Sequence, residues 1–231
     1  MMRFVSAAIF SLVFTAALAG DFEDGVAAFN RQDYTTALAK FRSAAKQGDV
    51  NAVFFLGSMY DNGQGVAQDY KEAVRWYTLA ARQGDARAQF NLGSMYGNGQ
   101  GVAQDYKEAA RWVTLAAQQG LAEAQNNLGL MYSKGQGVAQ DYKESFRWYL
   151  LAARQGSAEA QYNLGIRYGL GLGVLQDYTR AHMWFNIAAV GGDKDSVKNR
   201  DIVASKMTAQ QIEQAQRMAR ACMGSNYTKC D

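Results

Sequence analysis

The feature that most constrains this chain is an internal repeat with a period of 36 residues. The string GQGVAQDYKE begins at residues 63, 99 and 135, and the related string GLGVLQDYTR begins at residue 171. A Leu-Gly pair, a tryptophan and a closing glycine recur at the same step. A unit of this length cannot bury its large side chains alone, so neighbouring units must stack. The sequence therefore predicts an all-α solenoid of stacked antiparallel helix pairs.

Each repeat divides into two predicted helices, which we name the A helix and the B helix. One face of the first A helix carries Ala52, Leu56, Gly57 and Tyr60. Glycines in segment 62–65 favour a turn after it. Asp69 then precedes the B helix as an N-cap residue, and Glu72 is placed to complete a capping box. The buried face of the B helix carries Ala73, Trp76, Tyr77 and Ala80.

The repeat pattern also divides the chain into segments. Residues 49–192 hold four full repeats, and residues 20–48 hold a shorter copy that we expect to cap the N-terminal end of the array. The 36-residue period stops after Gly192. Residues 193–206 and 208–222 read as two further helices, the second opened by a capping box of Thr208 and Gln211. We expect residues 193–231 to close the C-terminal end.

Residues 1–19 have the three parts of a secretory signal peptide. Arg3 precedes an apolar run from Phe4 to Leu18, and the run ends in an A-x-A cleavage site before Gly20. A retained transmembrane anchor is the alternative, but it needs about 20 apolar residues, more than this run provides. The sequence therefore predicts export and a mature chain with no integral membrane segment, located in the periplasm or secreted.

Charge and composition narrow the classes of function. The 24 basic residues are interspersed with 21 acidic ones for a net charge of +3, a balance that does not indicate binding to nucleic acid. The chain has one histidine and two cysteines, too few for a zinc site or a Cys–His catalytic pair. We expect no metal, no cofactor and no catalytic residues.

The repeated pattern A-x-x-x-LG-x-x-Y-x-x-G-x-GV-x-x-D-x-x-x-A-x-x-W-x-x-x-AA-x-x-G resembles the Sel-one-like repeat, a relative of the tetratricopeptide repeat. The resemblance covers roughly residues 21–192. It implies a right-handed superhelix whose concave side is lined by A helices and binds proteins. Secreted bacterial members resemble adaptors in envelope signalling, cell-wall maintenance and host interaction. A cysteine-rich branch has been credited with β-lactamase activity, but its repeats carry cysteine pairs that these repeats lack.

Variable positions on the A helices are the candidate binding residues. The position before each Leu-Gly pair holds Phe55, Asn91, Asn127 and Asn163. In the tetratricopeptide relatives this position faces the groove, where an amide can donate to and accept from a peptide backbone. Flanking positions add aromatic and charged side chains. The predicted partner-binding set is Asn91, Asn127, Asn163, Phe54, Phe55, Arg87, Phe90 and Tyr162. Hydrogen bonding of these asparagines to a neighbouring helix or loop is the alternative.

Other candidate sites favour structural interpretations. Ser43 and Lys46 match the S-x-x-K pattern of penicillin-recognising enzymes, but no S-D-N or K-T-G motif accompanies them. Glycine turns follow helices and lack a P-loop lysine, so they do not indicate a phosphate site. His182 occupies a packing position of the B helix, where we expect a satisfied, partly buried imidazole. The alternative function, an envelope hydrolase acting on β-lactam or cell-wall substrates, depends on Ser43 and Lys46.

Cys222 and Cys230 are the only cysteines, and both follow the repeats. Export would place them in an oxidising compartment, and the segment 224–226 between them is flexible. We expect them to form one disulfide. Taken together, the sequence predicts a non-enzymatic adaptor, monomeric, that binds a protein or peptide partner along its A helices.

Overall fold

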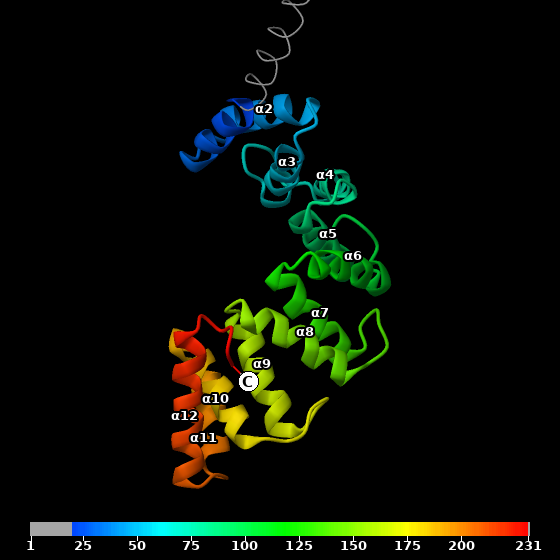
Figure 1. The fold of residues 1–231 in the computed structure, drawn as a ribbon. Helices are drawn as coiled ribbons and strands as arrows, with labels where there is room; N and C mark the ends of the chain where they lie inside the picture. Colours follow the sequence, from blue (N-terminus) through cyan, green and yellow to red (C-terminus); the bar gives the residue numbers. More distant parts are fainter. Residues whose placement is uncertain (1–19, 231) are drawn as a thin grey trace, which may run out of the picture. The chain divides into compact units, whose positions relative to one another are not determined.

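The computed structural model describes residues 20–230, and the predicted signal peptide at residues 1–19 lies outside them. All regular structure in this range is helical (Figure 1). The chain divides after Asp105 into two compact units. The first unit contains a helix over residues 20–30, followed by α2 (Tyr34–Lys46), α3 (Val50–Asn62), α4 (Tyr70–Arg82) and α5 (Ala86–Asn98).

The second unit begins with α6 (Tyr106–Gln118), α7 (Ala122–Lys134), α8 (Tyr142–Arg154) and α9 (Ala158–Leu170). It ends with α10 (Tyr178–Ala188), the short 3-10 helix η1 (Ala189–Gly191), α11 (Lys194–Ala204) and α12 (Ala209–Gly224). The odd-numbered helices α3 to α9 are the A helices, and the even-numbered α4 to α10 are the B helices. Within each unit, every A helix contacts the B helix that follows it and the helix that precedes it. The predicted fold class, an all-α solenoid of helix pairs, is confirmed.

The glycine of each Leu-Gly pair lets an aromatic ring of the B helix lie against the backbone of the A helix. A Cβ atom at Gly57 would lie 2.6 Å from the ring of Tyr77, and one at Gly129 would lie 2.7 Å from Tyr149. Both tyrosine rings are almost fully buried. Since real Cβ atoms do not approach this closely, only glycine permits the pair to pack at this distance.

The second glycine of each loop joins one repeat to the repeat before it. Gly137 has φ +73°, and a Cβ atom there would lie 1.8 Å from the carbonyl oxygen of Tyr106, the first residue of α6. Gly173 repeats this contact on Tyr142 of α8, where the corresponding distance is 2.1 Å. Positive φ and lack of space both exclude residues other than glycine at these positions. The glycine thereby lets the loop contact the first turn of the preceding B helix.

Two columns of glutamine, residues at the same position of successive repeats, were not predicted from the sequence; one joins consecutive repeats and the other bonds within a repeat. Buried amides of the A helices donate to carbonyl oxygens at the end of the preceding B helix, at 3.1 to 3.2 Å. Those within a single unit pair Gln89 with Ala81, Gln125 with Ala117 and Gln161 with Ala153. Loop glutamines such as Gln68 instead donate back to the last turn of the A helix, here to the Asp61 carbonyl oxygen at 2.7 Å. The carbonyls bonded by the A-helix glutamines also accept from backbone N–H groups, as Ala81 does from Gly84 at 3.1 Å, so these amides add a second bond at the helix end.

The capping of the B helices differs in one detail from the expectation. The Asp69 carboxylate accepts from the backbone N–H groups of Lys71 and Glu72, as predicted. Glu72 does not reach back to Asp69; its carboxylate pairs with Arg75 on the next turn. The reason is that the Asp69 N–H already donates to the Tyr60 carbonyl oxygen at 3.0 Å, so the second half of the capping box has no donor left.

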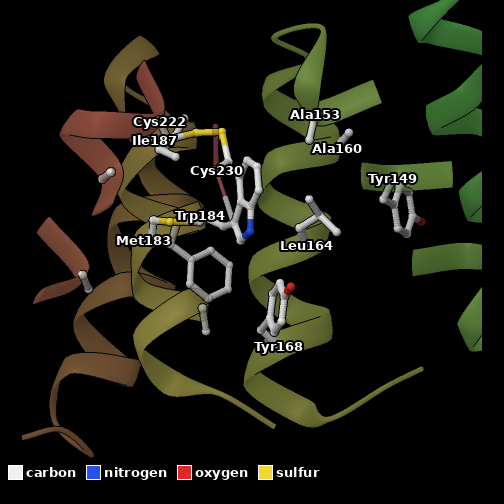
Figure 2. Close-up of a cluster of buried hydrophobic side chains, with 14 of the residues drawn as sticks. Tyr149, Ala153, Ala160, Leu164, Tyr168, Met183, Trp184, Ile187, Cys222 and Cys230 are labelled. Atoms are coloured by element: carbon white, nitrogen blue, oxygen red, sulfur yellow. A yellow bond between two sulfur atoms is a disulfide. The ribbon is translucent and has the colours of Figure 1, made fainter. Parts of the chain in front are cut away.

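The C-terminal helices pack on the last repeat. Small buried residues of α12, Ala215 and Ala219 among them, face α10. Trp184 of α10 points towards Leu164 of α9, and the Cys222–Cys230 disulfide lies beside them (Figure 2). The predicted disulfide and the predicted capping box at Thr208 are both present. Among residues 20–230, none of the helices combines the length and the apolar composition that spanning a bilayer requires.

We expect Trp184→Ala to lower the free energy of unfolding by about 3–5 kcal/mol, because its indole is almost fully buried and its loss leaves a cavity. Trp76 stands at the same repeat position but is only half-buried, so Trp76→Ala is a matched control with a smaller expected loss. Urea unfolding followed by circular dichroism measures both. Equal losses would show that burial does not govern this column.

We expect the disulfide to stabilise the protein by roughly 2–3 kcal/mol, since it closes a short loop. It also holds Tyr227, whose ring lies over Gly156 at the turn between α8 and α9. Alkylation without reduction, followed by mass spectrometry, should detect no free thiol in the folded chain. The double variant Cys222→Ala, Cys230→Ala should unfold at a lower urea concentration; an unchanged midpoint would contradict the prediction.

Candidate protein-binding surface

The predicted binding residues lie on α3 and α5 of the first unit and on α7 and α9 of the second. All eight are half-buried, so each contacts its own chain and also keeps part of its side chain in solvent. The two units differ in chemistry: the first presents aromatic rings, a guanidinium group and one amide, and the second presents two amides and a phenol.

In the first unit, Arg87 joins two consecutive repeats. Its guanidinium lies 4.2 Å from the centre of the Phe54 ring and donates to the Asn51 side-chain oxygen at 2.7 Å. The same group forms an ion pair with Asp85, the N-cap residue of α5. The position 36 residues before Arg87 is Asn51, so neighbouring members of one column touch. A guanidinium stacked on a ring keeps its outward face available to a partner.

Phe55 has an internal role that sequence reasoning missed. Its ring stacks on Phe41 of α2, with 4.8 Å between centroids, and meets Phe29 edge-on at 5.6 Å. The phenylalanines of the shortened N-terminal copy provide these partners. A column that carries asparagine in the later repeats thus carries an aromatic residue where the array meets its N-terminal copy.

Asn91 borders a buried polar group of the preceding repeat. Burial raises the pKa of the Tyr77 hydroxyl, and Asn91 and Ser58 form hydrogen bonds to that hydroxyl, which lower its pKa. Tyr77 also donates to the Asp61 carboxylate at 3.3 Å, while burial raises the pKa of Asp61. The alternative considered for these asparagines was a hydrogen bond to a neighbouring helix. Asn91 makes such a bond, to Tyr77 of α4.

In the second unit, amides of successive A helices face one another. The Asn163 amide lies 3.5 Å from the side-chain oxygen of Asn126, a buried residue of α7. Asn127, half-buried beside it, occupies the same column as Asn163 one repeat earlier. The long separation means that Asn163 retains most of its capacity to bond a partner.

Helix α11 continues the A-helix columns, although the Leu-Gly motif is missing. Asn199 stands 36 residues after Asn163, and its amide donates to the Tyr162 hydroxyl at 2.9 Å. Ser196 likewise stands at the buried alanine position of the A helices and is itself fully buried. The expectation that the period stops after Gly192 is thus wrong for these columns. The asparagine at the 36-residue step was the signal that could have revealed α11 as a fifth A-type helix.

The residues of the hydrolase alternative have structural contacts. The Ser43 hydroxyl donates to the Asp21 carboxylate at 2.6 Å, and Lys40 forms ion pairs with both Asp21 and Asp24. These contacts attach the helix over residues 20–30 to α2. Lys46 lies exposed in the last turn of α2. Within residues 20–230, no group of His, Cys, Asp and Glu side chains is placed to hold a metal ion.

His182 is buried, but it is not satisfied as we expected. The imidazole is 3% exposed, and within the described part of the chain its Nδ1 has no hydrogen-bond partner. Burial lowers its pKa, the nearby Arg200 lowers it further and Asp201 opposes this effect. The imidazole therefore prefers its neutral form in the folded protein.

Comparisons with known proteins agree on one family. The sequence profile of the Sel1 repeat matches residues 50–85, 86–121, 122–157 and 158–193. A search of curated proteins finds no match.

Solved structures of three bacterial proteins have a similar fold. A protective antigen of uropathogenic Escherichia coli strains, displaying an SLR fold, is 36% identical with a TM-score of 0.76; the match covers 83% of this chain but only 42% of the antigen. A Sel1 repeat protein from Oxalobacter formigenes is 30% identical with a TM-score of 0.71, over 91% of this chain and 79% of that one. A sel1 repeat protein from Klebsiella pneumoniae, 22% identical with a TM-score of 0.52, shares the fold over 81% of this chain and 93% of its own.

We expect His182 to make stability fall as the pH drops below about 6.5, because the unfolded chain then binds a proton that the folded state disfavours. His182→Phe places the residue of the preceding repeat, Phe146, at this position and removes the titration. The stability difference between the two proteins should change by on the order of 1 kcal/mol between pH 7 and pH 5 in urea unfolding. A difference independent of pH would contradict the prediction.

Proposed function

The chain belongs to the Sel1 repeat family, whose members generally act as protein-interaction scaffolds, and we propose that it binds a protein or peptide along the A helices without catalysing a reaction. The proposal assigns the contact to the predicted set of Asn91, Asn127, Asn163, Phe54, Phe55, Arg87, Phe90 and Tyr162. The Ser43 hydroxyl, engaged by Asp21, supports a structural role for the residues of the hydrolase alternative.

One observation carries the proposal: side chains at equivalent or adjacent positions of successive repeats lie close enough to touch. Arg87 bonds Asn51, Asn163 approaches Asn126 and Asn199 bonds Tyr162, at sequence separations of 36 or 37 residues. Within each unit, residues far apart in the sequence therefore form one strip of surface. A strip of half-exposed polar and aromatic groups is suited to an elongated ligand such as a peptide segment.

The asparagine amides suit a peptide backbone because each offers one acceptor oxygen and two donor hydrogens. A bound segment places a carbonyl and an N–H at regular intervals, and in the second unit α7 and α9 present the amides of Asn127 and Asn163 one repeat apart. The half-exposed rings of Phe54, Phe90 and Tyr162 would add apolar contacts between the amides. The amides of such a surface would bond the backbone of a bound peptide, and the residues that vary between repeats would determine which partner binds.

We further propose that the mature protein acts in the periplasm or is secreted, as a monomer. The disulfide between Cys222 and Cys230 supports an oxidising compartment. The predicted signal peptide agrees with this location. The antigen from uropathogenic Escherichia coli, to which this chain is similar over part of its length, supports a place outside the cytoplasm.

We expect the triple variant Asn91→Ala, Asn127→Ala, Asn163→Ala to lose at least tenfold in affinity for peptides bound by the native chain, since three backbone-bonding amides are removed together. The measurement is a peptide array probed with labelled protein, followed by titration of the strongest peptides. The matched control is Asn62→Ala with Asn98→Ala, exposed asparagines of α3 and α5 outside the column. Equal affinity of the triple variant and the control would show that this column is not the contact.

A further inference from the structure

Two neighbouring cavities lie between α9 and α11, at the position that α11 takes as an additional A-type helix. The first, of about 300 Å³, is lined from the start of both helices, and the second, of about 150 Å³, from their later turns. Tyr162 lines the first cavity and Asn199 the second, so the hydrogen bond between them forms the partition. We name these two cavities and their partition the α9–α11 groove.

The first cavity is acidic. Glu159 of α9 and Asp195 of α11, both exposed, line it together with Asp193. Asp193 is the N-cap residue of α11 and accepts from the Ser196 backbone N–H at 2.7 Å. Lys194 and Lys198 are also on α11, but they do not line the cavity.

A buried hydroxyl adds a polar atom to the wall of this cavity. Ser196 also lines it, and its Oγ atom is fully buried without a hydrogen bond of normal geometry within the described part of the chain. A looser side-chain contact of this hydroxyl with the Asp193 carboxylate lowers the pKa of Asp193, so the cavity combines negative charge with a polar wall. This combination is suited to a cationic group that also donates hydrogen bonds.

The second cavity is apolar, and part of its lining departs from the repeat pattern. Leu170 is 65% exposed and Ile202 is 47% exposed, and both line it beside Ile166. Earlier repeats have Asn62, Asn98 and Lys134 where the fourth has Leu170. The following loop also departs from the pattern, with the 88% exposed Leu175 where the other repeats have alanine. Exposed leucines that replace polar and small residues indicate a surface that contacts a partner.

The two ends of the groove carry opposite charge. Lys206, whose ammonium lies 5.3 Å from the centre of the Tyr178 ring, borders the apolar cavity, while the carboxylates surround the other. A basic side chain is attracted to one end and repelled from the other, which sets the direction in which a segment binds. Glu159 and Ile166 are seven residues apart on α9, about 10 Å along the helix. An extended peptide in the polyproline II conformation covers that distance in about three residues, and residues i and i+3 then point to the same side because this helix has three residues per turn.

We propose that the α9–α11 groove binds an extended segment of a partner protein that carries Lys or Arg and, three residues later, a large aliphatic side chain. The basic group enters the cavity of Glu159 and Asp195, and the aliphatic group enters the cavity of Leu170 and Ile202. This inference rests on the proposed function and specifies the partner's chemistry at one end of the A-helix surface. It adds Asp195, Asn199 and Ile202 of α11 to the binding residues.

The test is fluorescence polarisation of labelled peptides with the disulfide-bonded chain of residues 20–231. The probes are extended peptides with Lys and Leu at positions i and i+3, and the same peptides with Glu in place of Lys. We expect the Lys peptides to bind and the Glu peptides to bind at least tenfold more weakly. Raising the salt concentration from 50 to 300 mM should weaken binding of the Lys peptides.

Two variants test the cavities separately, and both restore residues found in other repeats. Glu159→Arg places the residue of Arg87 in the acidic cavity and should reduce affinity for the Lys peptide at least tenfold. Its matched control is Glu123→Arg, the same change in the same column one repeat earlier. Leu170→Asn places the residue of Asn62 and Asn98 in the apolar cavity and should weaken binding of the same peptide. All these sites are exposed, and circular dichroism checks that each variant is folded.

The outcomes separate this inference from the proposed function. If array peptides bind the native chain and respond to the triple asparagine variant, but Glu159→Arg and Glu123→Arg have equal effects, the groove assignment is wrong and the proposed function stands. If no peptide binds the native chain, both are wrong. A concentration-dependent dimer that Leu170→Asn abolishes would assign the groove to a second copy of this chain and overturn the inference.

Discussion

The close contact between a glycine backbone and an aromatic ring sets the geometry on which the rest of this structure depends. Tyr77 lies on Gly57, Tyr149 on Gly129 and Phe185 on Gly165, each at a distance that a Cβ atom would prevent. This contact fixes how near the B helix lies to the A helix. Because the separation is the same in these repeats, equivalent A-helix residues fall into register, and side chains 36 residues apart can touch.

Much of the scaffold could be predicted because it repeats. Three features recur in successive repeats: the Leu-Gly pairs, the loop glycines and the aspartate caps. Each has the local structure that the sequence predicts. Where residues depart from the pattern, prediction was weaker. Glu72 was expected to bond the Asp69 backbone, but the Tyr60 carbonyl had already taken that donor. Choices between competing partners depend on distances that a sequence does not contain.

Sequence analysis predicted the repeat positions of the candidate site, but it did not predict which side chains contact one another there. Sequence analysis identified the position that holds Asn91, Asn127 and Asn163, yet it gave no sign that the Phe55 ring stacks on Phe41. It also ended the array at Gly192, because α11 has lost the Leu-Gly motif by which a repeat is recognised. Asn199 and Ser196 preserve the register without the motif. Helix α11 therefore keeps the position of an A helix without the Leu-Gly motif, because no further repeat has to pack against it.

The seating of Gly137 on Tyr106, and of Gly173 on Tyr142, has a consequence for how such chains change over evolutionary time. Each repeat brings one half of this junction in its loop and the other half at the start of its B helix. A duplicated block of 36 residues therefore arrives with compatible surfaces at both ends, and the array can lengthen or shorten by whole blocks without new complementary mutations. Insertions of any other length would break the junction, so binding surfaces of different reach arise by recombination in discrete steps.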